Sequence, residues 1–221
     1  ALPYLPWLPD WIPPLRLLAG PLKRLVWAVV LGQVAWTLLP LLVRRRGRAW
    51  PWTPGPGLAS AAVFLASVAV YGAVSTRLAD STMFPGGDEP HYLVVTQSLL
   101  YDGDLRIANN HEQGDYRPYY PGSLRPHYRT LGSDGEIYSI HPVGLPVLAV
   151  PAFAAGGYRG VVWLVILLAA GTAALLWRWA FALTGSLPAA TFAWAAVGLS
   201  APFVFSSGTV YPEIPAGFCV M

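Results

Sequence analysis

The chain has 221 residues, of which 55% are hydrophobic and only 11% are charged, whereas ordinary soluble domains carry about 25% charged residues. This composition argues against a soluble domain and predicts a membrane protein, in keeping with ten tryptophans, a residue type that favours the membrane interface. The net charge of +3 says little by itself, and we expect no nucleic-acid partner. Because Cys219 is the single cysteine, an internal disulfide framework is excluded.

Residues 1–57 form the first predicted unit. Residues 1–20 hold five prolines, which block a regular helix, so we expect an interfacial segment there. Residues 22–43 are a predicted span, because about twenty apolar residues cross ~30 Å of hydrocarbon. Four arginines follow and favour a cytoplasmic connector over a lipid-headgroup or nucleic-acid site: Arg44, Arg45, Arg46 and Arg48.

Residues 58–221 form the second predicted unit, an all-α polytopic membrane domain. Its expected elements are an outward span at 58–78, an extracytoplasmic loop at about 79–142, a juxtamembrane or partly inserted helix at 143–155, an inward span at 160–181 and an outward span at 187–207. This order puts Tyr211-Pro212-Glu213 on the same outer face as the loop. Because the chain begins at Ala1 and stops inside an apolar run at Met221, we expect a fragment of a larger membrane protein.

The loop has its own predicted structure. Residues 90–101 read as a helix with Pro90 in the first turn, where its missing N–H is tolerated, and Asp88 or Glu89 can cap it. Residues 127–140 read as a hairpin around Gly132-Ser133-Asp134-Gly135, with alternating strand formers on either side.

The loop also concentrates the polar chemistry of the chain. All four histidines and nine of the eleven acidic residues lie between Asp80 and His141. Asp88 and Glu89 are adjacent at the outer end of a span, where one carboxylate can take a proton from an attacking hydroxyl group and the other can orient a substrate. The alternative is that Asp88 only caps the helix, and the sequence leaves both interpretations open.

A divalent cation is a further hypothesis. Asp88, Glu89, His91 and His141 offer oxygen and nitrogen ligands, but their spacing matches no zinc signature. A hard cation such as Mg²⁺ or Mn²⁺, held by Asp88, Glu89 and a substrate phosphate, fits this set better.

Other loop residues are candidates for substrate binding. The planar guanidinium group of arginine binds phosphate oxygens well, so four loop arginines are candidates to bind a lipid phosphate: Arg106, Arg117, Arg125 and Arg129. Each of them can equally be a solvated residue that pairs with an acidic side chain. The loop tyrosines, Tyr138 among them, can stack on a sugar or form an interfacial belt. His141 can bind a substrate phosphate or hydroxyl, or be a buried histidine that the backbone satisfies.

Together these residues resemble a known family. The chain is similar to the N-terminal part of GT-C glycosyltransferases in the order of three features. An outward span comes first, and Gly87-Asp88-Glu89 with His91 and Tyr92 follows it. A long loop then ends in Tyr138-Ser139 and His141-Pro142-x-Gly144-Leu145-Pro146. The protein O-mannosyltransferase and aminoarabinose transferase branch is nearest. The resemblance covers roughly residues 58–221 and includes Tyr211-Pro212-Glu213.

The resemblance implies a GT-C-like helical bundle with a large extracytoplasmic first loop, in a bacterial inner membrane. It implies transfer of a sugar from a polyprenyl-phosphate donor to an acceptor hydroxyl on a glycan, lipid or protein, with Asp88 as base or essential carboxylate and Glu89 as its helper. The residues expected at the substrate are His91, Tyr92, Arg117, Arg125, Tyr138, His141 and Glu213. Such enzymes have more spans than this chain holds, so we expect the fragment to be inactive alone.

Two other classes stay open. A transporter would place ionisable residues inside its spans, and the predicted spans contain almost none. A non-catalytic membrane subunit would use the outer loop to bind a cation or a partner, and would tolerate Asn at position 88, because Asn caps a helix nearly as well as Asp.

Overall fold

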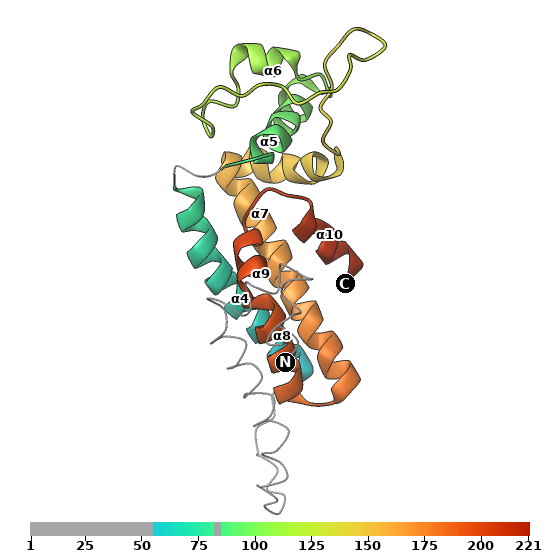
Figure 1. The fold of residues 1–221 in the computed structure, drawn as a ribbon. Helices are drawn as coiled ribbons and strands as arrows, with labels where there is room; N and C mark the ends of the chain where they lie inside the picture. The colour runs from blue at the N-terminus through green and yellow to red at the C-terminus, as the bar shows by residue number, and fades with distance from the viewer. Residues whose placement is uncertain (1–54, 82–84) are drawn as a thin grey trace, which may run out of the picture. The chain divides into compact units, whose positions relative to one another are not determined.

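The computed structural model describes residues 55–81 and 85–221, which belong to one compact unit, Pro54–Met221. The predicted span 22–43 and the arginine cluster lie outside the described residues. The helices, in chain order, are α4 (Pro56–Ala79), α5 (Glu89–Gln97), the π-helical turn η2 (Ser98–Asp102), α6 (Ala108–Gln113), α7 (Gly144–Thr184), α8 (Leu187–Gly198), α9 (Ala201–Ser206) and α10 (Glu213–Val220) (Figure 1).

Two helices, α4 with 24 residues and α7 with 41, are long and apolar enough to cross a membrane by length and composition. At 1.5 Å per residue α4 is about 36 Å long, which exceeds the ~30 Å hydrocarbon core of a bilayer. Large apolar side chains stand on its outer surface, where Leu58 is 68% and Leu65 is 65% exposed. Such residues suit lipid better than water.

A glycine pair divides α7 into two helices. Gly156 and Gly157 have non-helical backbone angles, and Gly157 has a φ of 57°, in the left-handed region that glycine adopts without strain. The part before the pair lies across the end of the long part after it (Figure 1). This agrees with the predicted division between a short helix at 143–155 and a span at 160–181.

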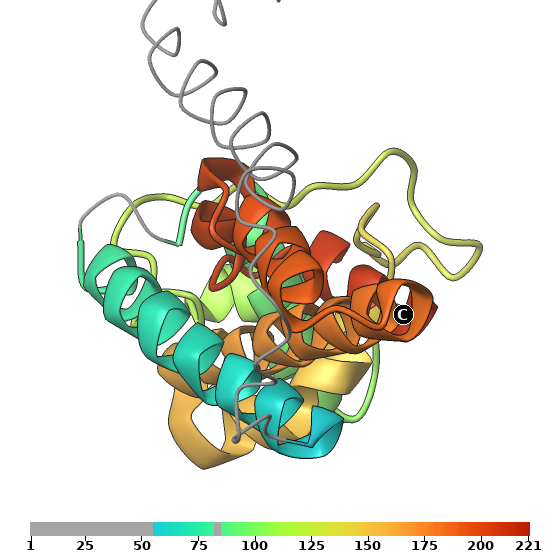
Figure 2. The ribbon, with the colours of Figure 1, turned by 90° about the horizontal axis from the view of Figure 1, so that it is seen from below.

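The long part of α7 packs between α4 and α8 (Figure 2). Tyr71 of α4 is buried against Val165 and Ala169 of α7. Hydrogen bonds tie the neighbouring helices together: the Trp194 indole N–H donates to the Ser67 hydroxyl at 3.0 Å, and the Trp177 indole N–H donates to Thr191 at 3.1 Å. Side-chain hydrogen bonds of this kind join helices where the surroundings are apolar.

The predicted span 187–207 is broken into α8 and α9. Pro202 has no N–H to donate to the carbonyl of Gly198, four residues earlier, so the helix cannot continue through this point. The Tyr71 hydroxyl donates to that carbonyl instead, at 2.9 Å. The chain still returns to the loop end of the helices, and Pro202 was the signal for the break.

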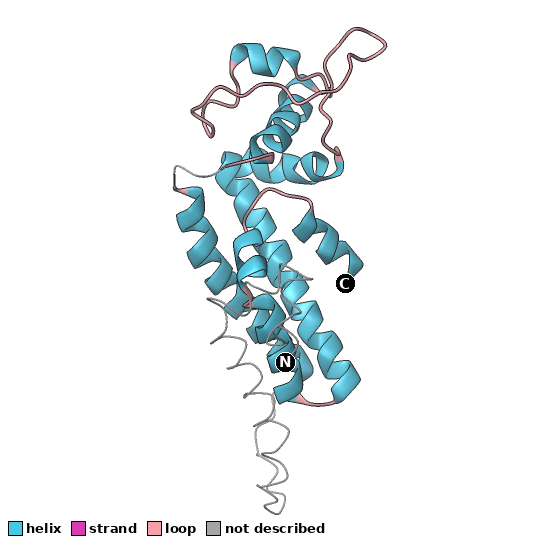
Figure 3. Ribbon diagram, in the orientation of Figure 1, coloured by secondary structure: helices cyan, strands magenta, loops and turns pink. Residues whose placement is uncertain are grey.

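The loop folds around α5, as predicted for residues 90–101, and its core is formed by Val94, Val95, Ile107, Tyr116 and Leu124. The predicted hairpin at 127–140 was wrong as a pair of strands, since residues 55–81 and 85–221 contain only an isolated bridge, Arg106 with Tyr138 (Figure 3). The two arms still meet, because the Ile140 N–H donates to the His127 carbonyl at 3.0 Å and the Gly132 N–H donates to the Glu136 carbonyl at 2.8 Å. Between these two bonds the Ile137 carbonyl accepts from the Ile107 N–H at 3.0 Å.

Candidate functional site

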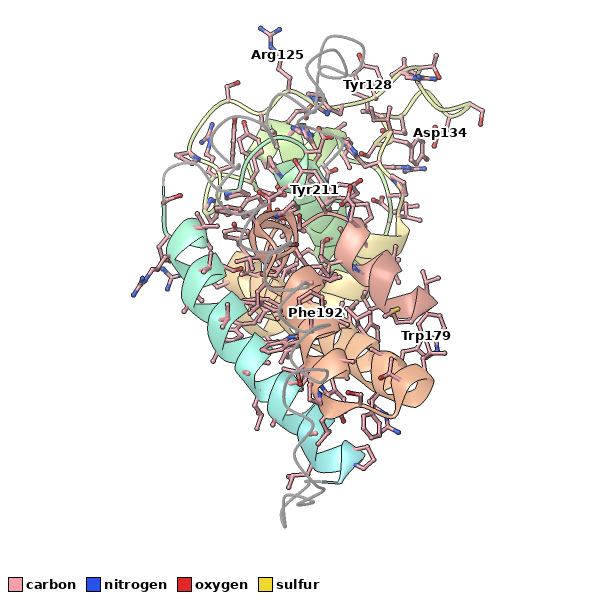
Figure 4. All side chains as sticks on the ribbon, turned by 60° about the horizontal axis from the view of Figure 1, so that its bottom comes forward. Arg125, Tyr128, Asp134, Trp179, Phe192 and Tyr211 are labelled. Atoms are coloured by element: carbon pink, nitrogen blue, oxygen red, sulfur yellow. The ribbon has the colours of Figure 1, made fainter. Side chains whose placement is uncertain are left out.

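Three segments that are distant in the sequence meet at the loop end of the helices. They are the start of α5 with Asp88, Glu89 and His91, the loop with His127 and His141, and the segment before α10 with Val210 and Tyr211. In Figure 4 Tyr211 lies between the loop, marked by Tyr128 and Asp134, and the helices that carry Phe192 and Trp179. The contact confirms that Tyr211-Pro212-Glu213 lies on the same side as the loop.

Glu89 joins two of these segments. Its side chain is fully buried, its Oε1 accepts the Val210 N–H at 2.6 Å, and its Oε2 accepts the Gly86 N–H at 2.9 Å. Burial raises the pKa of the Glu89 carboxyl more than these two N–H donors lower it. Since both oxygens are engaged by backbone amides, Glu89 is a clamp between the start of α5 and the segment before α10.

Asp88 stands at the N-cap position of α5, but its side chain makes no capping hydrogen bond. The side chain is 48% exposed, and its Oδ1 lies 3.6 Å from His127 Nδ1 and 4.0 Å from His141 Nε2. Of the two interpretations that the sequence left open, capping by the Asp88 side chain is therefore not observed. Its carboxylate faces histidines and solvent.

Tyr211 and Gly87 fix the backbone of Asp88. The Tyr211 hydroxyl accepts the Asp88 N–H at 3.0 Å and donates to the Gly86 carbonyl at 3.3 Å. Gly87 between them has a φ of 56°, and a Cβ at this position would collide with the Tyr211 hydroxyl. Glycine is thus required here both for the backbone conformation and for the close approach of the tyrosine.

Three histidines gather beside Asp88. One ring nitrogen from each of His91, His127 and His141 lies within 4.8 Å of the other two. The His91 and His127 rings stack with centroids 3.7 Å apart, and His127 Nδ1 is 3.3 Å from His141 Nε2. Burial, and then the neighbouring histidines, lower the pKa of His91 to about 3. Burial also lowers the pKa of His141, so both rings are neutral at pH 7.

Two further predicted residues lie at or beside this site. Tyr92 is buried, and its ring centroid lies 4.8 Å from that of His141 and 6.3 Å from that of Tyr211. Glu213 is exposed at the first position of α10. Burial, and after it the charges of Asp88 and Glu213, raise the pKa of Tyr92. Burial is also the main cause that raises the pKa of Tyr211, with smaller contributions from Glu89, Asp88 and Glu213.

Other predicted residues are elsewhere on the loop. The Tyr138 hydroxyl donates to Asp134 at 2.7 Å, beside the Arg106 side chain. Arg117 is exposed with its guanidinium close to Gly114, and Arg125 is exposed and points away from the fold (Figure 4). His127 was missed, and the signal for it was that it is one of four histidines confined to one loop.

A separate cavity of about 570 Å³ lies at the kink of α7. It is lined by residues of α4, the loop and α7, among them Asp80, Tyr101, Tyr119 and Arg159. Arg159 pairs with Asp80 at 2.6 Å. Asp88, Glu89 and the three clustered histidines do not line this cavity.

Comparison with known proteins gives no match, whether to protein-family models, to curated proteins or to solved structures.

Proposed function

We propose that this chain is part of a multi-pass membrane glycosyltransferase of the GT-C type, with Asp88 as its base or essential site carboxylate. The observation that carries the proposal is the state of Asp88. Its backbone is held by Tyr211, its neighbour Glu89 is clamped, and its own carboxylate is half-exposed without serving the helix as a cap. An accessible carboxylate on a fixed backbone suits proton abstraction from a bound hydroxyl.

The proposed reaction moves a sugar from a polyprenyl phosphate to an acceptor hydroxyl. The Asp88 carboxylate takes the hydroxyl proton, and the acceptor oxygen forms a bond to the anomeric carbon of the sugar. The bond between that carbon and the lipid phosphate oxygen breaks, and the electron pair leaves with the polyprenyl phosphate. The position of the base matters before its pKa in such a step, because the base must lie within hydrogen-bond distance of the group whose proton it takes.

The membrane setting fits a lipid-linked donor. Asp88 lies nine residues beyond the end of α4, which is long and apolar enough to cross a membrane. A donor held in the bilayer by its polyprenyl chain therefore brings its phosphate near the level of Asp88. The basic connector at 44–48 favours the cytoplasm, which puts this end of α4 on the extracytoplasmic face of a bacterial inner membrane.

Other groups have proposed supporting roles. His91, Tyr92 and His141 surround Asp88 and would contact the sugar or its phosphate, and Glu213 would contact the acceptor. Exposed loop arginines, Arg117 and Arg125, would neutralise the leaving phosphate after the loop moves toward it. A hard cation such as Mg²⁺ or Mn²⁺ at Asp88 and Glu89 stays a proposal, and it would have to compete for the Glu89 oxygens with the amides of Gly86 and Val210.

The test is sugar transfer in membranes that contain the full-length protein, with a panel of radiolabelled polyprenyl-phosphate sugars and acceptor extracts. Wild type is compared with Asp88→Asn and with Glu112→Gln, which changes an exposed acid of α6. We expect transfer by wild type and Glu112→Gln and loss of transfer in Asp88→Asn at equal expression. Equal transfer by all three proteins would remove Asp88 from the mechanism. If wild type transferred no sugar and Asp88→Asn were expressed and folded as well as wild type, the result would favour a cation- or partner-binding subunit.

A further inference from the structure

We propose that His91, His127 and His141, together with Asp88, bind one divalent transition-metal ion, with zinc as the best fit. This inference does not rest on the proposed sugar transfer, because it concerns the ligand atoms themselves and is tested by metal binding. With the ion bound, Asp88 would be the essential site carboxylate of that reaction and not its free base. It also differs from a hard-cation site at the two carboxylates, since three of its four ligands are ring nitrogens and Glu89 is not among them.

The distances between the ligand atoms carry the proposal. A tetrahedral zinc ion with bonds of 2.0–2.1 Å separates its ligand atoms by roughly 3.3 Å. His127 Nδ1 and His141 Nε2 are 3.3 Å apart, and Asp88 Oδ1 lies 3.6 Å and 4.0 Å from these two nitrogens. The three atoms form a triangle whose edges need to shorten by less than an ångström, and a ring nitrogen of His91 lies within 4.8 Å of the two histidine nitrogens.

The condition of the histidines agrees with metal binding. His91 is only 4% exposed, and its buried Nδ1 makes no hydrogen bond. Buried polar atoms are nearly always satisfied in folded proteins, and a metal ion within the cluster would give the His91 ring a partner.

A hydrogen bond between His127 and His141 is the competing account. One shared proton explains their 3.3 Å separation, but it leaves His91 Nδ1 buried and unsatisfied. A metal ion that binds His91 through Nδ1 gives all three rings a partner, and it requires His127 only to turn slightly within its stack while His127 Nδ1 stays beside His141 Nε2 and Asp88 Oδ1. The His127 side chain is 43% exposed and lies on a loop segment without regular secondary structure, so it can make that turn.

The ligand set also indicates the type of metal. Three imidazoles and one carboxylate suit zinc and similar transition metals, whereas Mg²⁺ and Ca²⁺ prefer oxygen ligands throughout. The ligands span residues 88–141, so binding would tie the loop to the start of α5. We therefore expect the ion to order the loop as well as to sit beside Asp88.

The experiment measures binding of Zn²⁺, Co²⁺ and Mg²⁺ to the chelator-stripped full-length protein in detergent, by calorimetry and by the visible spectrum of Co²⁺. We expect one Zn²⁺ per chain, intense tetrahedral Co²⁺ bands and no comparable Mg²⁺ binding. Changes in outer-shell partners typically weaken metal binding 10–100-fold, so His127→Ala, which removes a direct ligand, should weaken it by more than about 100-fold.

His111→Gln is the matched control, since His111 is the fourth histidine of the loop and does not belong to the close group of three. Its affinity for zinc should equal that of wild type. His127 is the most exposed of the three histidine ligands, so its loss should leave the fold intact even where His91→Ala does not. Absence of zinc binding by wild type, or equal binding by wild type and His127→Ala, would overturn the proposal.

Discussion

Replacement of Glu89 by glutamine tests whether this residue is the clamp that holds the site together. In Glu89→Gln one of the two carboxylate oxygens becomes an amide NH₂, which cannot accept a hydrogen bond. Either the Val210 N–H, now bound at 2.6 Å, or the Gly86 N–H, bound at 2.9 Å, then loses its acceptor. Because Glu89 is fully buried, water cannot replace the lost partner.

The size of the effect follows from the charge and the burial. A hydrogen bond to a charged group contributes about 1.5–3 kcal/mol, and every 1.4 kcal/mol is a factor of ten, so local opening should become roughly 10- to 100-fold more frequent. We expect the amide hydrogen that loses its acceptor, that of Val210 or that of Gly86, to exchange faster by that factor. The assay is hydrogen–deuterium exchange of the full-length protein in detergent.

The control for this prediction is Glu112→Gln, which makes the same chemical change at an exposed position of α6. It should leave the exchange rates of Val210 and Gly86 unchanged. If Glu89→Gln also left both rates unchanged, the two hydrogen bonds would not hold these segments together. The account of Glu89 as a clamp would then be wrong.

Three further predictions concern residues around the site and the loop. Tyr211→Phe removes the acceptor of the Asp88 N–H, which should lower local stability by about 1 kcal/mol and speed exchange of that amide without unfolding the helices. Gly87→Ala should lower the midpoint of thermal unfolding more than Gly135→Ala, because both glycines have positive φ but only a Cβ at position 87 meets another side chain; equal shifts would contradict this. Burial raises the pKa of the Tyr119 hydroxyl well above its ordinary value of 10.0. The contribution of the protonated hydroxyl to the free energy of unfolding is therefore present below pH 10, and above pH 10 it falls by at most about 1.4 kcal/mol per pH unit. Tyr119→Phe should therefore flatten the alkaline limb of the stability profile, as followed by unfolding between pH 9 and 12.

The helices were predicted well where a single segment determines them. Residues 58–78 carry a long apolar run and form α4, and Pro90 after two acids marks the start of α5. The break in the span 187–207 depends on Pro202 together with a distant hydroxyl, Tyr71, that satisfies the carbonyl left free. The turn around residues 132–135 was predicted, but the strands were not formed, since residues 137–138 pair with residues 106–107 and local alternation does not reveal which partner a strand former takes.

The site was predictable in its location but not in its contacts. The confinement of all histidines to one loop indicated where the polar chemistry lies. No spacing rule indicated that His127 would stack on His91 or that Tyr211 would fix the Asp88 backbone, because both contacts depend on how the loop returns across α5. The predicted substrate residues Arg117 and Arg125 are exposed on the loop, and the sequence gives no means of telling which arginines face Asp88.

The two adjacent acids show how one dipeptide can serve two purposes. An ionised carboxylate is expensive to bury unless donors surround it, and the two backbone amides beside the buried Glu89 offset part of this cost. Its clamp fixes the chain on either side, so Asp88 can keep its carboxylate half-exposed without losing its position. Exchange of the two residues would place the longer side chain beside the histidines and the shorter one where it cannot span Gly86 and Val210. The order Asp-Glu is therefore expected to matter as much as the presence of two acids, and the double variant Asp88→Glu with Glu89→Asp should lose both the clamp and metal binding, while Glu112→Asp retains both.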